Sequence, residues 1–314
     1  MKKEIVIFLV GPTAVGKSEV AVGLAQMIGA EIISCDSMQV YKGMDIGTAK
    51  PLQNLRNQIP HHLVDIIEPH QNYSCAEFIK RAEVLIEDVF QRGKLPLLVG
   101  GSGLYVKALV DGIFPGPNAD WKIRKALHLQ AKRYGDEFLY ETLVKVDPAA
   151  ASKLHPNDRR RIVRALEVYE KTGIPISRLQ PKREGIFLRY EVMIIGLIRE
   201  RDDLYRRINE RVDRMFGDGL VEEIKNLATK GMGLIAKQAL GYKEIVGYLE
   251  GKYDLEEARI LLKRATRRFA KRQLTWFRHD ERVKWVNISP DEPAEKVVER
   301  VLRGLDEGRW NVRS

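Results

Sequence analysis

The sequence has few cysteines and no long apolar run. Its two cysteines, Cys35 and Cys75, cannot build a disulfide framework, and the lack of a CxxC pair argues against a zinc or redox site. The longest apolar run, Ile5–Val10, is far too short to cross a bilayer. It follows a basic start as in a signal peptide, but Gly11-Pro12-Thr13 ends it early and no small-residue cleavage site follows. We expect a cytoplasmic protein that has no membrane association and is a monomer.

The composition is that of a globular chain with an excess of positive charge. Hydrophobic residues make up 44% and charged residues 31% of the 314 residues, which excludes collagen-like, mucin-like and fully disordered chains. This length suggests two domains, or one domain with a large insertion. The 53 basic and 43 acidic residues give a formal net charge of +10. Such a balance is typical of chains that bind nucleic acid, a membrane surface or phosphorylated metabolites.

Short apolar segments alternate with helical patterns over much of the sequence. Ile5–Val10 is continuous, β-branched and stopped by glycine, which is typical of a strand buried on both faces. After it, Val20, Leu24 and Ile28 fall on one helical row. We expect further strands at 31–34, 95–99 and 192–197. The alternation predicts an α/β fold of the P-loop type, with a doubly wound parallel sheet flanked by helices.

The middle of the chain has a different pattern. Pro115-Gly116-Pro117 is a break, and the segment from Trp121 to about Lys171 shows helical periodicity with almost no strand signal. We therefore predict a catalytic core of residues 1–117 and 186–314 with a helical insertion at 118–185. The pattern from 202 to 278 is helical, so we expect helices at the C-terminal end of the core. From 291 onward the chain is short and charged, and we expect it to be peripheral.

A phosphate-binding loop is predicted between the first strand and the first helix. The segment Gly11–Ser18 fits GxxxxGK[ST] at every specified position. Its glycines let backbone N–H groups face one centre, and the helix N-terminus adds positive potential. Lys17 adds a full charge, and the Ser18 hydroxyl offers a ligand to Mg²⁺. The expected diphosphate-binding residues of the loop are Gly11, Pro12, Thr13, Ala14, Val15, Gly16, Lys17 and Ser18.

Two other segments are predicted at the same edge of the sheet. Asp36–Tyr41 follows the second strand and combines a carboxylate, a hydroxyl, an amide and an aromatic ring; it is either a ligand-binding segment or an ordinary turn. Gly100–Gly103 follows a later strand, where the glycines permit close approach of a ligand or of backbone. That strand ends without an acidic residue, which weakens an interpretation as an ATPase.

Three groups of basic residues are candidates for anion binding. Four arginines occur within 159–164, before an apparent helix body. Arg207 and Arg211 share a helix face and could hold a diphosphate. A third group, within 259–272, is predicted to form a helix docked on the core with a basic outer face. One such run of basic residues is usually a solvated surface. Several runs on a chain of this net charge make nucleic-acid binding about as expected as a solvated surface. The row predicted for that face is Arg259, Lys263, Arg267 and Lys271.

Several segments together resemble the tRNA dimethylallyltransferases, also called tRNA isopentenyltransferases. The similarity runs from about Ile5 to Arg278, and the combination of motifs is far more specific than the phosphate loop alone. The motifs are GPTAVGKS at Gly11–Ser18, ISCDSMQVYKGMDIGTAK at Ile33–Lys50, PHHLVDI at Pro60–Ile66, LLVGGSGLY at Leu97–Tyr105, NDRRRIVRALEVYEKTG at Asn157–Gly173, LYRRINERVDRMFGDGLVEE at Leu204–Glu223, QALGYKEI at Gln238–Ile245 and TRRFAKRQLTWFR at Thr266–Arg278.

The resemblance implies transfer of a dimethylallyl group from dimethylallyl diphosphate to tRNA. The acceptor would be the exocyclic amine N(6) of the adenosine 3′-adjacent to the anticodon, so the expected partners are dimethylallyl diphosphate and the anticodon stem-loop of tRNA, with Mg²⁺ as cofactor. It implies that Asp36 is the general base, with Lys17 and Thr13 as further catalytic residues. Many members of the family have Thr where this chain has Ser18, and both side chains keep the hydroxyl. The implied tRNA-binding residues are Asp36, Ser37, Met38, Gln39, Ser102, Arg124, Arg160, Arg161, Ile162, Val163 and Arg164.

Two other functions fit parts of the sequence. In a phosphate-loop kinase, Asp36 would bind an acceptor hydroxyl and the arginines would clamp phosphates. In a non-catalytic RNA-binding ATPase, the loop would act only as a switch. Transfer from radiolabelled dimethylallyl diphosphate to unmodified tRNA, compared with ATP alone, distinguishes the three.

Overall fold

A computed structural model describes residues 3–114, 116–179 and 184–306 of the chain. The chain divides into two compact units: one contains the residues up to Val110 and those from Ile186 on, and the other is Asp111–Gly185. The second unit thus starts a few residues before the expected insertion at 118–185. Of the expected break, Pro115 lies outside the described residues.

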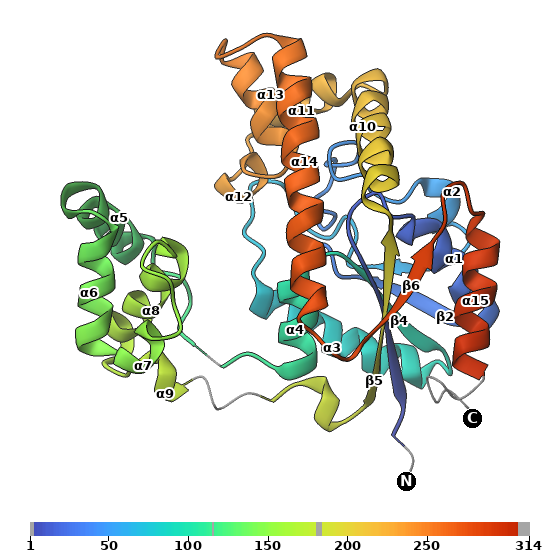
Figure 1. Ribbon diagram of the computed structural model, residues 1–314, viewed down its shortest axis with the longest axis horizontal. Coiled ribbons are helices and arrows are strands. Elements are labelled where there is room, and N and C mark those ends of the chain that lie inside the picture. Colours follow the sequence, from blue (N-terminus) through green and yellow to red (C-terminus); the bar gives the residue numbers. More distant parts are fainter. Residues whose placement is uncertain (1–2, 115, 180–183, 307–314) are drawn as a thin grey trace. The chain divides into compact units, whose positions relative to one another are not determined.

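The first unit is built on a six-stranded sheet whose strands are all parallel (Figure 1). The strand order β3-β2-β4-β1-β5-β6 puts β1 and β4 in the middle. The strand order is not that of the chain, because the chain crosses over between parallel strands. The strands are β1 (Ile5–Val10), β2 (Ala30–Ser34), β3 (His61–His62), β4 (Leu95–Gly100), β5 (Glu191–Arg199) and β6 (Val283–Ile288).

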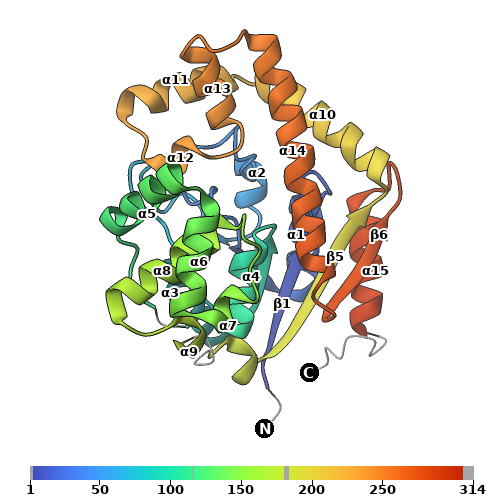
Figure 2. The same ribbon diagram turned by 60° about the vertical axis from the view of Figure 1, so that its left-hand side comes forward.

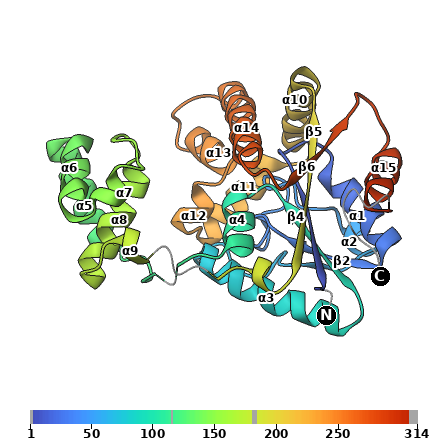
Figure 3. The ribbon, with the colours of Figure 1, turned by 60° about the horizontal axis from the view of Figure 1, so that its bottom comes forward.

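Helices cover both faces of this sheet (Figure 3). Alternate residues of β1 point to opposite faces, so that Phe8 and Val10 join one core while Ile7 and Leu9 join the other. The core around Phe8 includes α3 (Cys75–Gln91) and α4 (Gly103–Asp111), and the core around Leu9 includes α1 (Lys17–Ile28) and α15 (Ala294–Asp306). Burial of both faces explains why β1 is apolar throughout.

A group of helices extends from the sheet at the end where the parallel strands finish (Figures 1 and 2). The chain leaves β5 into α10 and returns along α14, and the two helices lie side by side and antiparallel. The later residue of α14 pairs with the earlier residue of α10, as antiparallel packing requires: Lys263 bonds to Asp213, and Arg267 bonds to Asn209. These helices are α10 (Arg201–Gly217), α11 (Leu220–Lys230), α12 (Leu234–Lys237), α13 (Tyr242–Leu249) and α14 (Leu255–Arg278), and two short elements elsewhere are α2 (Gln53–Arg56) and the 3-10 turn Ile186–Leu188.

The second unit is helical, as its periodicity predicted. It contains α5 (Trp121–Tyr134), α6 (Asp136–Val146), α7 (Pro148–Ala151), α8 (Arg159–Thr172) and α9 (Ile176–Leu179). Its core includes Leu127, Leu139 and Ile162, contributed by three different helices. In the described part of the chain, no helix is long and apolar enough to span a membrane.

The C-terminal part of the first unit differs from the expectation. It contains an edge strand, β6, that we did not predict, paired in parallel with β5. The expectation that the chain from 291 onward is peripheral is wrong. In α15, Val297 and Val301 are buried against the sheet core, and Val298 packs on Gly23 of α1. These residues present an apolar face that completes the cover over α1.

Candidate active site

The phosphate loop has the backbone conformation that its glycines permit. Gly11 has φ 149°, and a Cβ there would lie 2.6 Å from the Leu197 carbonyl oxygen of β5. Gly16, at the N-terminus of α1, has φ 108°. Ala14 is also left-handed, with φ 65°, which is strained for a residue with a Cβ. The loop is therefore a tight curl between β1 and α1, as its sequence predicted.

Lys17 lies within this curl and beside other charged groups. Its Nζ donates hydrogen bonds to the carbonyls of Gly11 (2.9 Å) and Pro12 (2.7 Å). Burial and the nearby Arg211 lower the pKa of Lys17 to about 7, although Asp36 acts in the opposite direction. Two buried cations without an anion between them repel each other, so an anion bound beside Lys17 and Arg211 would stabilise the charged forms of both.

Arg207 and Arg211 reach the loop from α10. The Arg207 Nε donates to the carbonyl of Ala14 at 3.0 Å, so it touches the loop directly. Burial lowers the pKa of Arg211 to about 10, Asp36 opposes this shift, and Arg214 and Arg207 add to it. Lys17 and Arg211 thus lie within electrostatic range of each other and of Asp36, while Arg207 contacts the loop. The shared helix face predicted for the two arginines is what directs them there.

Asp36 lies just beyond β2, at the edge of the sheet where β1 enters the phosphate loop. Its Oδ1 accepts hydrogen bonds from the N–H groups of Met38 (2.8 Å) and Gln39 (3.3 Å). The Gln39 side chain is held in turn by the Ser34 hydroxyl (3.2 Å) and by the Ala49 carbonyl (3.4 Å). In the described residues the hydrogen bonds to this carboxylate fall on Oδ1. The turn therefore orients the carboxylate through Oδ1.

The glycine turn after β4 admits protein groups at close range. A Cβ on Gly100 would lie 2.4 Å from the Cys35 carbonyl, and one on Gly103 would lie 2.2 Å from the Trp276 ring. At Gly101 the neighbour is the amide nitrogen of Gln273, 2.1 Å away. Ser102 is partly buried, and its N–H donates to the Cys35 carbonyl at 3.4 Å. Backbone approaches Gly100 closely, and side chains approach Gly101 and Gly103, so these glycines permit close approach of protein groups.

Gln273 is a site residue that we did not predict from the sequence. It is 7% exposed, and its side chain joins the phosphate loop to the glycine turn. It lies in the family-like segment Thr266–Arg278, but a glutamine in a basic helix is ordinary and gave no sign of this role.

Ser18 is the one predicted metal ligand. It is exposed in the first turn of α1, next to Lys17. A hydroxyl oxygen suits Mg²⁺, which prefers hard oxygen ligands and is usually held by few protein groups together with substrate phosphates. The residue type and its place at a phosphate-binding helix N-terminus therefore fit a Mg²⁺ ion that arrives with a diphosphate.

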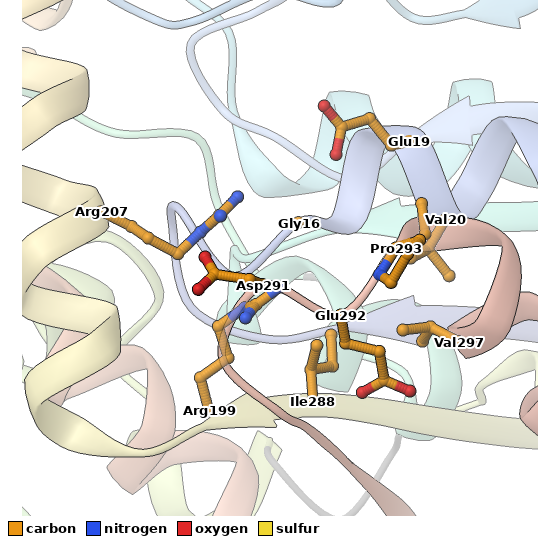
Figure 4. Close-up of a pocket in the computed structure, with 11 residues that line it drawn as sticks. Gly16, Glu19, Val20, Arg199, Arg207, Ile288, Asp291, Glu292, Pro293 and Val297 are labelled. Atoms are coloured by element: carbon orange, nitrogen blue, oxygen red, sulfur yellow. The ribbon is translucent and has the colours of Figure 1, made fainter.

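A pocket of about 290 Å³ lies beside the first turn of α1 (Figure 4). Arg199 and Arg207 line it together with Asp291 and Glu292, and Figure 4 shows Asp291 between the two arginines. The carboxylates make it a poor site for a diphosphate. The lining of this pocket therefore does not fit the diphosphate site that the sequence predicts, which is the loop Gly11–Ser18.

The predicted arginines of the second unit fall into two classes. Arg160 and Arg161 are exposed on α8. Arg124 and Arg164 instead hold the carboxylate of Glu167, which is 0% exposed, at 2.9 and 2.6 Å. The side chains of Ile162 and Val163 are buried in the helical core. Ile162 and Val163 were predicted as tRNA-binding residues, but their side chains cannot contact RNA because this amphipathic helix packs them inward.

The basic face predicted for α14 is also different. The row of Arg259, Lys263 and Arg267 faces α10 and pairs with its polar residues, so it is not an outer face. A different row on α14 is exposed and contains Arg264, Arg268 and Arg272, with Lys271 beside it. The charge run was correctly placed on a helix, but which side it shows to solvent depends on α10.

Comparisons with known proteins agree with one another. The family model described as IPP transferase matches residues 39–280. The chain is 52% identical over 282 residues to a tRNA dimethylallyltransferase of Geobacter sulfurreducens, covering 89% of this chain and 91% of the relative. A relative of the same name from Carboxydothermus hydrogenoformans is also 52% identical, over 95% of this chain and 96% of its own.

Among the solved structures that resemble this one are two transferases. One is the tRNA isopentenylpyrophosphate transferase of Bacillus halodurans, with a TM-score of 0.71, 43% identity and 98% coverage of both chains. The other is a eukaryotic dimethylallyltransferase acting on tRNA, with a TM-score of 0.80, 30% identity and coverage of 98% of this chain and 79% of that one.

Proposed function

The chain belongs to the IPP transferase family, and we propose that it transfers the dimethylallyl group from dimethylallyl diphosphate to tRNA. The acceptor is N(6) of the adenosine 3′-adjacent to the anticodon, and the products are N(6)-dimethylallyladenosine and diphosphate. The observation that carries the proposal is the convergence of Asp36, Lys17 and Arg211 at one edge of the sheet. In the proposed reaction, Asp36 is the base for the amine, and the two cations beside it hold the leaving group.

Asp36 acts on the nucleophile. The exocyclic amine of adenine is a poor nucleophile because its lone pair is delocalised into the ring. As the new C–N bond forms, the nitrogen becomes acidic, and the Asp36 carboxylate accepts its proton. The two backbone N–H groups on Oδ1 keep the carboxylate in one orientation. The target base must leave the stack of its loop to reach this carboxylate.

The phosphate loop acts on the leaving group. Cleavage of the allylic C–O bond puts negative charge on the diphosphate, and fixed donors aimed at that charge lower the barrier. Lys17, the loop N–H groups and Arg211 supply them, while Arg207 braces the loop at Ala14. Mg²⁺, held by Ser18 and the diphosphate, would add charge neutralisation when bound.

Two assays separate this function from the kinase alternative. We expect purified protein to move label from radiolabelled dimethylallyl diphosphate into unmodified tRNA. We expect no label transfer from γ-labelled ATP to tRNA or to nucleotides. Label transfer only from ATP would support the phosphate-loop kinase. Label transfer from neither substrate would support the non-catalytic RNA-binding protein.

We propose that the exposed arginines of the second unit bind tRNA phosphates. The double variant Arg160→Gln/Arg161→Gln should weaken tRNA binding and flatten its salt dependence, because each lost phosphate contact lowers the log–log slope by about 0.7 to 0.9. Arg164 is left intact, since its loss would weaken the pairing of buried Glu167 and destabilise the unit. Filter binding at several salt concentrations measures the slope.

The control for this double variant removes the same charge from α5. Lys125→Gln/Lys132→Gln alters two exposed lysines of the same unit that carry no predicted RNA contact. An Arg160/Arg161 variant with native helical content and the same salt slope as the control would refute the RNA role of these arginines.

We also propose that the enzyme acts as a cytoplasmic monomer. Light scattering of the purified protein should give a single species near the 35.9 kDa chain mass. A stable dimer mass at micromolar concentration would contradict this.

A further inference from the structure

The Gln273 side chain of α14 uses both ends of its amide between two different loops. Its Oε1 accepts a hydrogen bond from the Thr13 N–H of the phosphate loop at 2.8 Å. Its Nε2 donates to the Gly101 carbonyl of the glycine turn at 3.0 Å. The residue is 7% exposed, so water has little access to the amide. A buried amide with both ends paired is costly to remove, because its partners are left unsatisfied.

The surroundings of this amide are shaped to hold it. Gly101 has no room for a side chain, since a Cβ there would lie 2.1 Å from the Gln273 Nε2. The same turn supports the Asp36 segment, because the N–H groups of Cys35 and Ser102 bond to the carbonyls of Val99 (2.7 Å) and Cys35 (3.4 Å). A chain of contacts therefore runs from the phosphate loop through Gln273 to the residue before Asp36.

We propose that Gln273 is a positioning residue that sets the distance between the diphosphate cradle and the Asp36 carboxylate. This inference rests on the proposed function, because the two loops are there assigned to the leaving group and to the base. Bond formation at the amine and bond breakage at the diphosphate occur on one carbon. A relative shift of about 1 Å between such groups can cost about 10²-fold in rate.

The test uses the full-length protein and a double-mutant cycle. Gln273→Ala should lower kcat by roughly 10- to 100-fold and leave tRNA affinity within about twofold. Gly101→Ala should lower kcat because its Cβ displaces the amide. The double variant should be little worse than Gln273→Ala alone, because the 2.1 Å clash disappears with the amide and the next neighbour of the Cβ is the Gly11 carbonyl oxygen at 3.2 Å.

The matched control is Thr266→Ala. Thr266 is equally buried on α14, but within the described part of the chain its hydroxyl bonds only to the Leu262 carbonyl of the same helix (2.8 Å). It should lower Tm without changing kcat by more than about twofold. A merely structural role for Gln273 would likewise lower Tm and leave kcat unchanged. That result, or full additivity of the Gly101 and Gln273 changes, would overturn the inference.

A second readout does not depend on transfer. Binding of inorganic diphosphate with Mg²⁺, measured by calorimetry, should weaken in Gln273→Ala by about tenfold and stay unchanged in Thr266→Ala. If wild-type protein binds diphosphate but transfers no label, the proposed function fails, and the binding measurement still tests whether Gln273 supports the phosphate loop. Equal diphosphate affinity in wild type and Gln273→Ala would then refute it.

Discussion

Asp36→Asn should reduce the single-turnover rate of transfer to tRNA by about 10²- to 10⁴-fold, the usual effect of losing a general base. Asparagine keeps the size of the side chain and an oxygen for the N–H groups of Met38 and Gln39, so the turn should survive. It cannot take the proton of the amine. Rapid-quench measurement with saturating substrates gives the rate without interference from product release.

Binding separates loss of chemistry from loss of the complex. The tRNA affinity of Asp36→Asn should stay within a few-fold of wild type, because many basic side chains contribute to binding and one carboxylate acts mainly in the transition state. Asp218→Asn, at an exposed position after α10, is the matched control and should retain full activity. A near-native single-turnover rate in Asp36→Asn would remove this residue from the mechanism.

Lys17→Met should reduce kcat/KM for dimethylallyl diphosphate by about 10²- to 10³-fold, the size of effect seen when one donor to a developing anion is lost. The charge of Lys17 is aimed at the diphosphate, and burial next to Arg211 makes its protonated form costly until an anion is bound. Methionine has a similar shape and no charge. Steady-state kinetics with varied diphosphate substrate measures the loss.

The same variant should bind tRNA alone as well as wild type does. Lys94→Met is its control, since Lys94 is exposed just before β4, at the end of the strand remote from the loop. It should leave both substrates unaffected. If Lys17→Met lost tRNA affinity and kept its diphosphate affinity, the assignment of the phosphate loop would be wrong.

Local patterns were enough to predict the site-bearing half of the fold. The strand Ile5–Val10 and the phosphate loop were predicted with their observed bounds, because a buried strand, a glycine turn and an amphipathic helix each leave their signal within a few residues. Asp36 was placed correctly for a similar reason. In a parallel sheet, residues just after neighbouring strands meet at one edge.

The features that were missed depend on partners far away in the sequence. β6 mixes buried and exposed residues over six positions without a strict alternation, and only its pairing with β5 identifies it as part of the sheet. Arg259 and Lys263 looked solvent-exposed until Asp213 of α10 supplied their partner. Gln273 became a site residue only when α14 folded back over the phosphate loop. Helix packing of this kind has no local signature.

The most direct test of the account is to map the label in tRNA after reaction with radiolabelled dimethylallyl diphosphate. Nuclease digestion and nucleoside analysis identify both the modified nucleotide and the modified atom. The account predicts one labelled product, N(6)-dimethylallyladenosine, located 3′-adjacent to the anticodon, and its absence from the same reaction with Asp36→Asn. Label at another nucleotide or atom, or equal labelling by the Asp36 variant, would contradict it.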